Sequence, residues 1–230
     1  AASLLKQESA ARSRHVFYDG LRELSLAGTR PQQTLELIAT IEQAAQQKAS
    51  QDSEEVTSDV ATEIENSRSR VLTTAYHKIH NEKIPGATAA ILGTTAFCHE
   101  DYLTTAARQA LEVTATPEDG PLLKAAVRSP LSQTRLVAVS ALVNILKEAA
   151  QPELERLQDD ATDGVRLVAA VALVNLGEKK ALETFGQLLD SAELPIRTRS
   201  AQILRHVTGQ SFEFAAYVEK EKRVDALKRW

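Results

Sequence analysis

The sequence predicts an all-α fold built from repeated pairs of helices, and three observations support this prediction. Alanine and leucine supply much of the 43% apolar content, whereas the 230 residues include only 9 glycines and 7 prolines. Residues that are not branched at Cβ lose little freedom in a helix, so this mixture favours helices over strands. Apolar residues recur at spacings of three and four, and a period of 31 residues runs through the second half of the chain.

Composition excludes several classes of protein. The net charge of −4, on a chain of which 25% is charged, gives no strong attraction to polyanions, so we expect no nucleic-acid partner. No stretch approaches the roughly 20 apolar residues that a membrane-spanning helix needs. Cys98 is the only cysteine, so it cannot form an internal disulfide bond.

The chain contains no methionine, which indicates that the initiator is missing from the sequence. The first residues, "AAS", would also suit the end of a signal-peptide cleavage site, although no signal peptide is visible. The missing start and the single cysteine favour an exported or periplasmic location over a cytoplasmic one.

The first half of the chain predicts a helical leader at residues 1–82. Residues 3–26 and 32–48 are expected to be helices, and turn signals separate them. A longer helix is expected at 53–81, where apolar residues form one stripe. The members of that stripe are Val56, Val60, Ile64, Val71, Leu72, Tyr76 and Ile79. The segment "KIPGATAAILGTTAFC" predicts a further helix after the Pro85–Gly86 turn.

Residues 83–209 contain the periodic segment. Four leucines stand 31 residues apart, and small residues stand four positions before each of them. The leucines are Leu111, Leu142, Leu173 and Leu204, and the small residues are Ala107, Ala138, Ala169 and Ser200. A second set marks the other half of each unit: Leu123, Leu154 and Phe185, with Ala126, Leu157 and Leu188.

Each unit is therefore expected to be two antiparallel helices joined by a short turn. The small residues let neighbouring helices approach closely, and the leucines fill the layer between them. One such hairpin cannot bury both of its faces, so the units are expected to stack into a right-handed α-solenoid of about three and a half units.

The repeat unit resembles HEAT repeats. The pattern combines a β-branched residue and arginine, then small residues and leucine, then glycine, as in "VRLVAAVALVNLGEKKALETFGQLL". It is similar to the short, roughly 30-residue HEAT-like class first associated with phycobilin lyases. The resemblance covers about residues 100–209, and it implies a superhelix of helix pairs.

The end of the chain, residues 210–230, departs from the period. Gly209 is placed to terminate a helix, and Phe212, Phe214 and Tyr217 follow it. The segment "HVTGQSFEF", with Trp230 at the end, resembles a tail that closes HEAT arrays in bacterial proteins. The resemblance implies a bacterial source and a C-terminal cap that covers the last open face.

Two polar columns share the 31-residue spacing. Arg135, Arg166 and Arg197 could form a ladder for phosphates or carboxylates. The favoured interpretation is structural, because in HEAT-like repeats such an arginine bonds acidic groups and carbonyls between repeats, and Asp163 and Glu193 precede two of them. The second column is Asn144, Asn175 and His206, for which we expect buried side chains that satisfy backbone groups in the turns.

The sequence offers weak candidates for a metal site or a catalytic centre. The candidate ligands are His77, His80, Cys98, His99, Glu100 and Asp101. Consecutive residues point in different directions, and paired zinc-binding motifs are absent, so we expect no metal and no cofactor. No recognisable nucleophile–base motif surrounds Cys98, which is expected to pack as a small hydrophobic residue.

The sequence therefore favours a non-enzymatic scaffold or adaptor that binds a protein partner. Stacked hairpins create an extended concave surface, which we expect the second helix of each unit to line. The candidate partner-binding residues are the exposed polar positions of these helices: Lys124, Arg128, Glu155, Arg156, Thr184 and Gln187.

Two alternatives remain open. The short repeat class includes phycobilin lyases, but a chromophore-binding protein needs aromatic residues in its groove, and here the aromatics are mainly at the ends. A HEAT-like DNA glycosylase needs a basic concave face. Here the basic residues of the C-terminal segment alternate with acidic ones: Lys220, Lys222, Arg223, Lys228 and Arg229.

Overall fold

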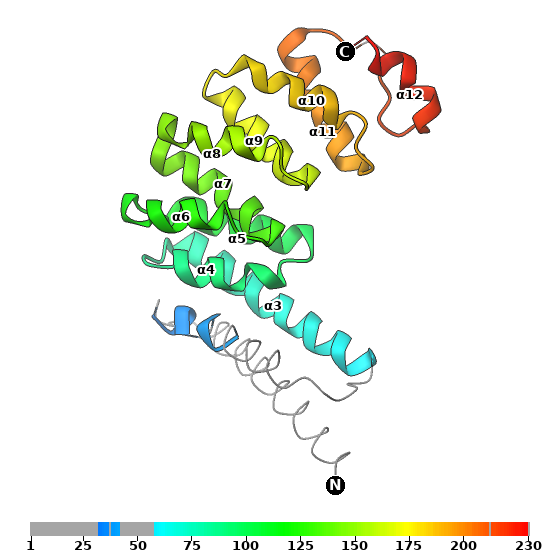
Figure 1. Cartoon of the computed structure of the whole chain (residues 1–230). Helices are drawn as coiled ribbons and strands as arrows, with labels where there is room; N and C mark the ends of the chain where they lie inside the picture. Colours follow the sequence, from blue (N-terminus) through cyan, green and yellow to red (C-terminus); the bar gives the residue numbers. More distant parts are fainter. Residues whose placement is uncertain (1–31, 37, 42–57, 212, 230) are drawn as a thin grey trace. The chain divides into compact units, whose positions relative to one another are not determined.

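The structure is a computed structural model, and it describes residues 32–36, 38–41, 58–211 and 213–229. Within these ranges every regular element is a helix, so the all-α prediction is confirmed. Figure 1 shows the helices in chain order. The helix predicted at 3–26 lies outside the described residues.

The chain forms two compact units, which are considered separately. Unit 1 extends to Leu122, and unit 2 begins at Leu123. The boundary between the units lies within the periodic segment at 83–209.

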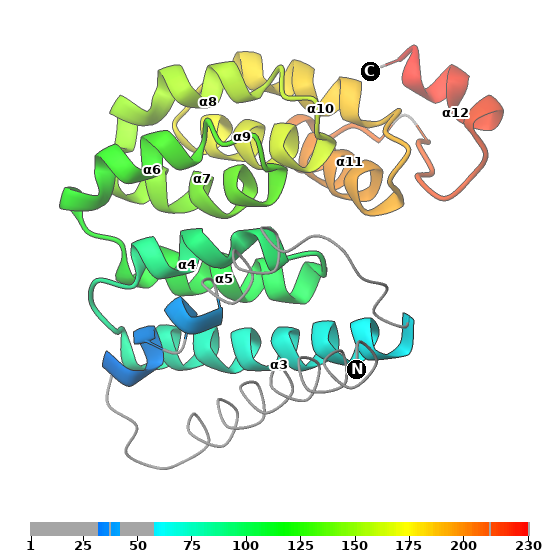
Figure 2. The same ribbon diagram turned by 60° about the horizontal axis from the view of Figure 1, so that its bottom comes forward.

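The described residues of unit 1 form short helical segments at 32–36 and 38–41 and five further elements. These are α3 (Ser58–Glu82), α4 (Thr88–Thr94), η1 (Thr95–Phe97), α5 (Asp101–Thr114) and η2 (Pro117–Asp119). Helix α5 packs against both α3 and α4. Figure 2 shows α3 running alongside α5.

Helix α3 confirms the prediction of a long helix. Its 25 residues compare with 15 in each of the longest helices that follow it. Val71, Leu72, Tyr76 and Ile79 form its buried stripe and are fully enclosed against the rest of unit 1. The side chains of Val56, Val60 and Ile64 lie outside the described residues. The chain leaves α3 through a turn in which Gly86 adopts a positive φ of 73°, as the Pro85–Gly86 signal predicts.

Unit 2 contains most of the periodic segment and the C-terminal tail. Helix α6 (Gly120–Ala126) spans the boundary between the units. The elements after it are α7 (Ser132–Leu146), η3 (Lys147–Ala150), α8 (Gln151–Leu157), α9 (Asp163–Asn175), η4 (Lys179–Ala181), α10 (Leu182–Leu188), α11 (Leu194–Thr208) and α12 (Lys220–Leu227).

The helices start with the predicted period. The longer helix of each pair begins 31 residues after the previous one, at Asp101, Ser132, Asp163 and Leu194. The short second helices keep the same interval and begin at Gly120, Gln151 and Leu182. Within unit 2, α9 packs against α7, α8, α10 and α11. The period of the sequence is therefore a period of the helices.

The apolar columns of the repeat form the core. The four leucines at 31-residue intervals are at most 4% exposed, and the small residues four positions before them are fully buried. Leu123, Leu154 and Phe185 of the short helices are also fully buried. Burial of a leucine or phenylalanine side chain stabilises a fold by about 1.5–3 kcal/mol, so these columns supply much of the driving force for folding.

The C-terminal tail contacts the last helix pair. Gly209 ends α11 with a φ of 72°, the left-handed conformation that a helix-terminating glycine adopts. Phe214 is buried, and the backbone carbonyl of Ala216 accepts a hydrogen bond of 2.9 Å from Nε of Arg197. Lys220 forms an ion pair of 2.7 Å with Asp190, in the turn between α10 and α11. These contacts lie where the sequence predicts a cap.

Candidate functional site

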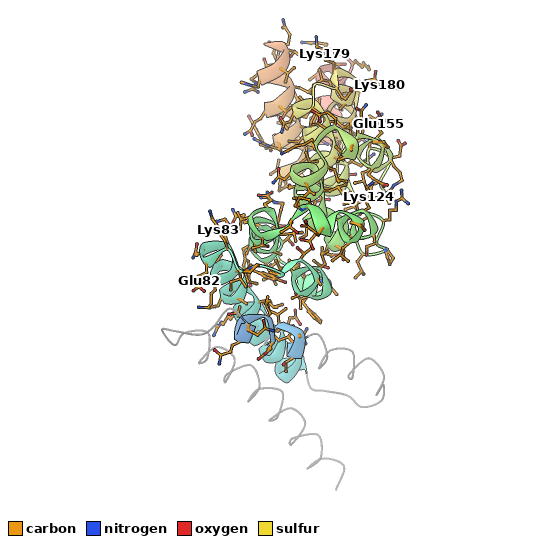
Figure 3. The ribbon with its side chains drawn as sticks, turned by 90° about the vertical axis from the view of Figure 1, so that its left-hand side faces the viewer. Glu82, Lys83, Lys124, Glu155, Lys179 and Lys180 are labelled. Carbon is orange, nitrogen blue, oxygen red and sulfur yellow. The ribbon has the colours of Figure 1, made fainter. Side chains whose placement is uncertain are left out.

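The predicted partner-binding residues all belong to unit 2: Arg128 lies in the turn after α6, and the others lie on the short helices α6, α8 and α10. Five of the six are exposed: Lys124, Arg128, Glu155, Arg156 and Gln187. In Figure 3, Lys124, Glu155 and Lys180 lie along one side of unit 2, and they come from α6, α8 and η4.

Thr184 is the exception, and the prediction that it is exposed is wrong. Its residue exposure is 5%, and its hydroxyl donates a hydrogen bond of 2.8 Å to Oε1 of Gln158. Spacing along one short helix does not distinguish the outward face from the face that meets the neighbouring second helix. Thr184 therefore links α10 to the end of α8.

Arg128 and Arg156 converge on one buried carboxylate, that of Glu153. Arg128 binds both carboxylate oxygens of Glu153, with a distance of 3.0 Å from Nε to Oε2. Nη2 of Arg156 donates a hydrogen bond of 2.7 Å to the carbonyl oxygen of Val127. Nε of the same residue lies 3.5 Å from Oε2 of Glu153. The hydrogen bond from Arg128 is the main cause that lowers the pKa of Glu153. These two arginines thus join α6 to α8, and their guanidinium groups are already engaged within the chain.

A polar groove lies between α8 and α10. Its volume is about 360 Å³. Four carboxylates line it, from Glu155, Asp159, Glu178 and Glu183, and Lys180 is the only basic residue among the lining residues. We call it the acidic groove. It contains three predicted residues: Glu155, Thr184 and Gln187.

The longer helices present a second groove, and the asparagine column borders it. The prediction that Asn144, Asn175 and His206 are buried is wrong, because all three are exposed. They stand in the last turns of α7, α9 and α11. Equal spacing correctly predicts that the three positions are equivalent, but it does not show which face of the helix they occupy.

The second groove lies between α9 and α11, and half of its lining residues are apolar. Its volume is about 440 Å³. Val171 and Val174 of α9 and Ile203 and Val207 of α11 supply its apolar surface. Val207 is 46% exposed, whereas the leucines beneath this face are almost fully buried. We call it the α9–α11 groove.

Four polar side chains complete the α9–α11 groove: Asn175, Arg199, Gln202 and His206. Asn175, Arg199, Gln202 and His206 are all exposed. Among the residues that the structure describes, no hydrogen bond or ion pair engages these four side chains. No lining residue is acidic. This site was not predicted from the sequence, although the column that contains Asn175 and His206 is the signal that could have located it.

The arginine column is structural at Arg135 and Arg197, as predicted. Arg135 donates from Nη1 to the carbonyl oxygens of Ser129 and Pro130, at 2.8 and 3.0 Å. Arg197 repeats this arrangement and donates to two carbonyls at the equivalent positions, both at 2.8 Å. Arg197 forms its remaining bond with Ala216, not with the side chain of Glu193.

Arg166 differs from the other two arginines. It pairs with Asp163 on its own helix, and its buried Nε has no hydrogen-bond partner in the described part of the chain. Arg166 therefore bonds an acidic group, as predicted, but within its own helix and not between repeats.

The candidate metal ligands do not gather into one cluster. His77 and His99 are exposed, whereas Nδ1 of His80 lies 3.0 Å from the carbonyl oxygen of Gln109. Over the described ranges, no group of three or more His, Cys, Asp or Glu side chains could hold a metal ion.

Cys98 packs in the core of unit 1, as predicted. It is 1% exposed, and its sulfur lies 3.9 Å from the hydroxyl of Tyr76, which in turn lies 2.8 Å from Thr94 Oγ1. Burial raises the pKa of the Cys98 thiol to about 11. The thiol is therefore protonated at neutral pH, and the thiolate is the form that acts as a nucleophile.

The basic residues of the tail are paired with carboxylates. Lys222 pairs with Glu219 at 3.3 Å, and Lys228 pairs with Asp225 at 3.7 Å. Arg229 lies 3.5 Å from Glu213. This pairing agrees with the alternation of charges in the sequence.

Comparisons with known proteins identify no relative: no protein-family model matches the chain, and no curated protein or solved structure matches it. None of the helices described here combines the length and the apolar character that a membrane span requires.

Proposed function

We propose that this protein is a non-enzymatic scaffold that binds a protein partner through unit 2. The observation that carries the proposal is the α9–α11 groove, in which one exposed and three half-buried apolar side chains line the same surface as polar groups that have no partner within the described chain. Protein interfaces combine an apolar centre with a rim of hydrogen-bonding groups. The groove presents both on two adjacent helices.

The proposal includes a HEAT-like solenoid as the architecture. The 31-residue spacing of the helix starts, the packing of α9 on both α7 and α11, and the buried alanine and leucine columns support it. In a solenoid, each repeat places equivalent positions on one continuous surface. Asn144, Asn175 and His206 would then form a polar row along the binding face.

The six predicted residues contribute unequally to such a surface. Arg128 and Arg156 hold Glu153, and Thr184 is buried, so these three serve the structure of unit 2. Lys124, Glu155 and Gln187 remain exposed on the short helices. The proposal therefore assigns the main contact to the α9–α11 groove.

No observation favours either alternative function. The lining of the α9–α11 groove contains no phenylalanine, tyrosine or tryptophan on which a tetrapyrrole would stack. A DNA-binding face needs a dense row of basic residues, and the same lining offers one arginine and one histidine.

A capture experiment with matched variants tests the proposal. The intact chain is immobilised beside two variants, Val207→Glu in the groove and Val224→Glu on α12. Both valines are exposed, 46% and 37%, so neither charge is forced into the core. We expect a partner protein to be retained by the intact chain and by Val224→Glu, and to be lost with Val207→Glu. Equal retention by all three would reject the groove as the contact surface.

A further inference from the structure

The two grooves of unit 2 differ in charge. Four carboxylates line the acidic groove, but none lines the α9–α11 groove, where the ionisable residues are Arg199 and His206. A groove without carboxylates and with an exposed guanidinium attracts a negatively charged ligand.

Arg199 is available for such a ligand, unlike its neighbours in the repeat. Arg166 pairs with Asp163, and Arg197 bonds backbone carbonyls. Arg199 is exposed, and within the described chain it forms neither an ion pair nor a hydrogen bond. A guanidinium group binds a carboxylate through two parallel hydrogen bonds, which gives direction as well as attraction.

Two amide side chains stand on the same surface. Asn175 on α9 and Gln202 on α11 are both exposed, and neither has a hydrogen-bond partner among the described residues. A side-chain amide offers both a donor and an acceptor, so it matches the donor and acceptor of a backbone peptide group. In a helical ligand those backbone groups are already paired, except at the ends. The amides therefore suit an extended segment better than a helix.

The apolar side chains of the groove set a third requirement for the ligand, after its charge and its backbone hydrogen bonds. Val171, Val174 and Ile203 line the groove together with the two amides, and all three are half-buried. In an extended segment, successive side chains point to opposite sides, so alternate residues face one surface. A ligand in which apolar residues alternate with others would place its apolar side chains against those of the groove.

We propose that the α9–α11 groove binds an extended acidic peptide segment of a partner protein. A carboxylate of the segment pairs with Arg199, its backbone bonds Asn175 and Gln202, and its apolar side chains contact the valines. The inference rests on the proposed function and specifies the chemistry of the partner.

Three fluorescein-labelled decapeptides test the proposal by fluorescence anisotropy with the full chain. In the first, leucine and glutamate alternate; in the second, glutamine replaces glutamate; in the third, lysine replaces it. We expect saturable binding of the glutamate peptide, binding at least about tenfold weaker for the glutamine peptide, and none for the lysine peptide. The glutamate peptide should lose affinity as the salt concentration rises.

Charge reversal locates the contact. Arg199→Glu should abolish binding of the glutamate peptide and create binding of the lysine peptide. Lys179→Glu is the matched control, because Lys179 is an exposed basic residue in η4 that lines neither groove and has no ion pair in the described chain. This control should leave binding of the glutamate peptide unchanged. Circular dichroism of each variant confirms that the helices are intact.

Three results would overturn the inference: equal affinity for the glutamate and glutamine peptides, no binding of any peptide, or equal loss in Arg199→Glu and Lys179→Glu. The capture experiment with Val207→Glu is independent of peptide charge. A partner that is lost with Val207→Glu but retained by Arg199→Glu would preserve the proposed function and reject an acidic segment.

Discussion

Arg135 binds Asp160 through two parallel hydrogen bonds, each 2.7 Å long, across 25 residues of sequence. The guanidinium of Arg135, at the start of α7, thereby reaches the turn that precedes α9. Asp160 also accepts a hydrogen bond of 2.9 Å from the backbone N–H of Thr162. Arg135 also donates to the carbonyl oxygens of Ser129 and Pro130, in the turn before α7. One arginine therefore connects the turns that precede two successive longer helices.

Loss of the Asp160 carboxylate should destabilise unit 2. Both side chains are largely buried, with exposures of 12% for Arg135 and 6% for Asp160, so Asp160→Ala leaves a buried charge without its partner. We expect the free energy of unfolding to fall by about 3 kcal/mol, measured by urea denaturation at pH 7. Asp159→Ala is the control, because Asp159 is exposed and adjacent. A loss as large in the control would contradict the special role of the pair.

The free energy of unfolding should fall in acid, because Asp160 and Glu153 then become protonated. Burial alone would raise the pKa of Asp160, but hydrogen bonds from Arg135 and Thr162 outweigh it and bring the pKa below its ordinary value. The pKa of Glu153 is also lowered, chiefly by the hydrogen bond from Arg128.

A carboxyl group with a lowered pKa in the folded state stabilises the fold fully above its unfolded pKa, about 4 for aspartate and glutamate. This stabilisation is lost as the pH falls through the folded pKa. Unfolding by urea between pH 7 and pH 2 should therefore show a decline that begins near pH 5. In Asp160→Asn the starting stability is lower and the decline is shallower. An identical decline in the variant would exclude Asp160 as a contributor.

An exchange of two residues should give Arg166 the partner that Arg135 has. Around Arg135 the relevant positions are Ser132 and Asp160; 31 residues later, around Arg166, they are Asp163 and Ser191. The serine and the aspartate have exchanged places, and Nε of Arg166 is left without a partner in the described chain. The double variant Asp163→Ser and Ser191→Asp gives Arg166 the same arrangement of serine and aspartate that surrounds Arg135.

We expect the double variant to be more stable than the natural sequence by about 1 kcal/mol, because a buried donor gains an acceptor. Each single variant should be less stable than the double variant, since Asp163→Ser leaves Arg166 unpaired and Ser191→Asp places two carboxylates together. Thermal unfolding of all four proteins measures the coupling. A double variant that melts below the natural sequence contradicts the assignment.

The hydrogen bond between Thr184 and Gln158 should stabilise the packing of α8 and α10. Thr184→Val keeps the shape of the side chain but removes the donor, and the acceptor on Gln158 then lacks its partner. We expect a loss of about 1 kcal/mol in the free energy of unfolding. Gln187→Ala, on the exposed face of the same helix, should change stability little. Denaturant unfolding distinguishes the two cases, and equal losses would disprove the buried link.

Periodicity accounts for what the sequence predicted well. The spacing of Leu111 and Leu142 identified core positions because the same packing recurs in each pair of helices. The stripe that contains Leu72 and Tyr76 located α3 for a similar reason, since one face of a long helix must be buried.

The wrong predictions concern which face of each helix is covered by a neighbouring helix. Asn175 and Thr184 are both polar residues on periodic helices, yet the first is exposed and the second is buried. Their exposure depends on which neighbouring helix covers each face, and this information comes from packing. The α9–α11 groove was missed for the same reason, because its valines resemble core residues in a one-dimensional pattern.

The most direct test of the account is hydrogen exchange of the backbone amides, measured by mass spectrometry on the free chain and on its complex with the captured partner. The account predicts slower exchange in α9 and α11 upon binding, with little change in α8 and α10. Protection confined to α8 and α10 would contradict it, because the partner would then occupy the acidic groove.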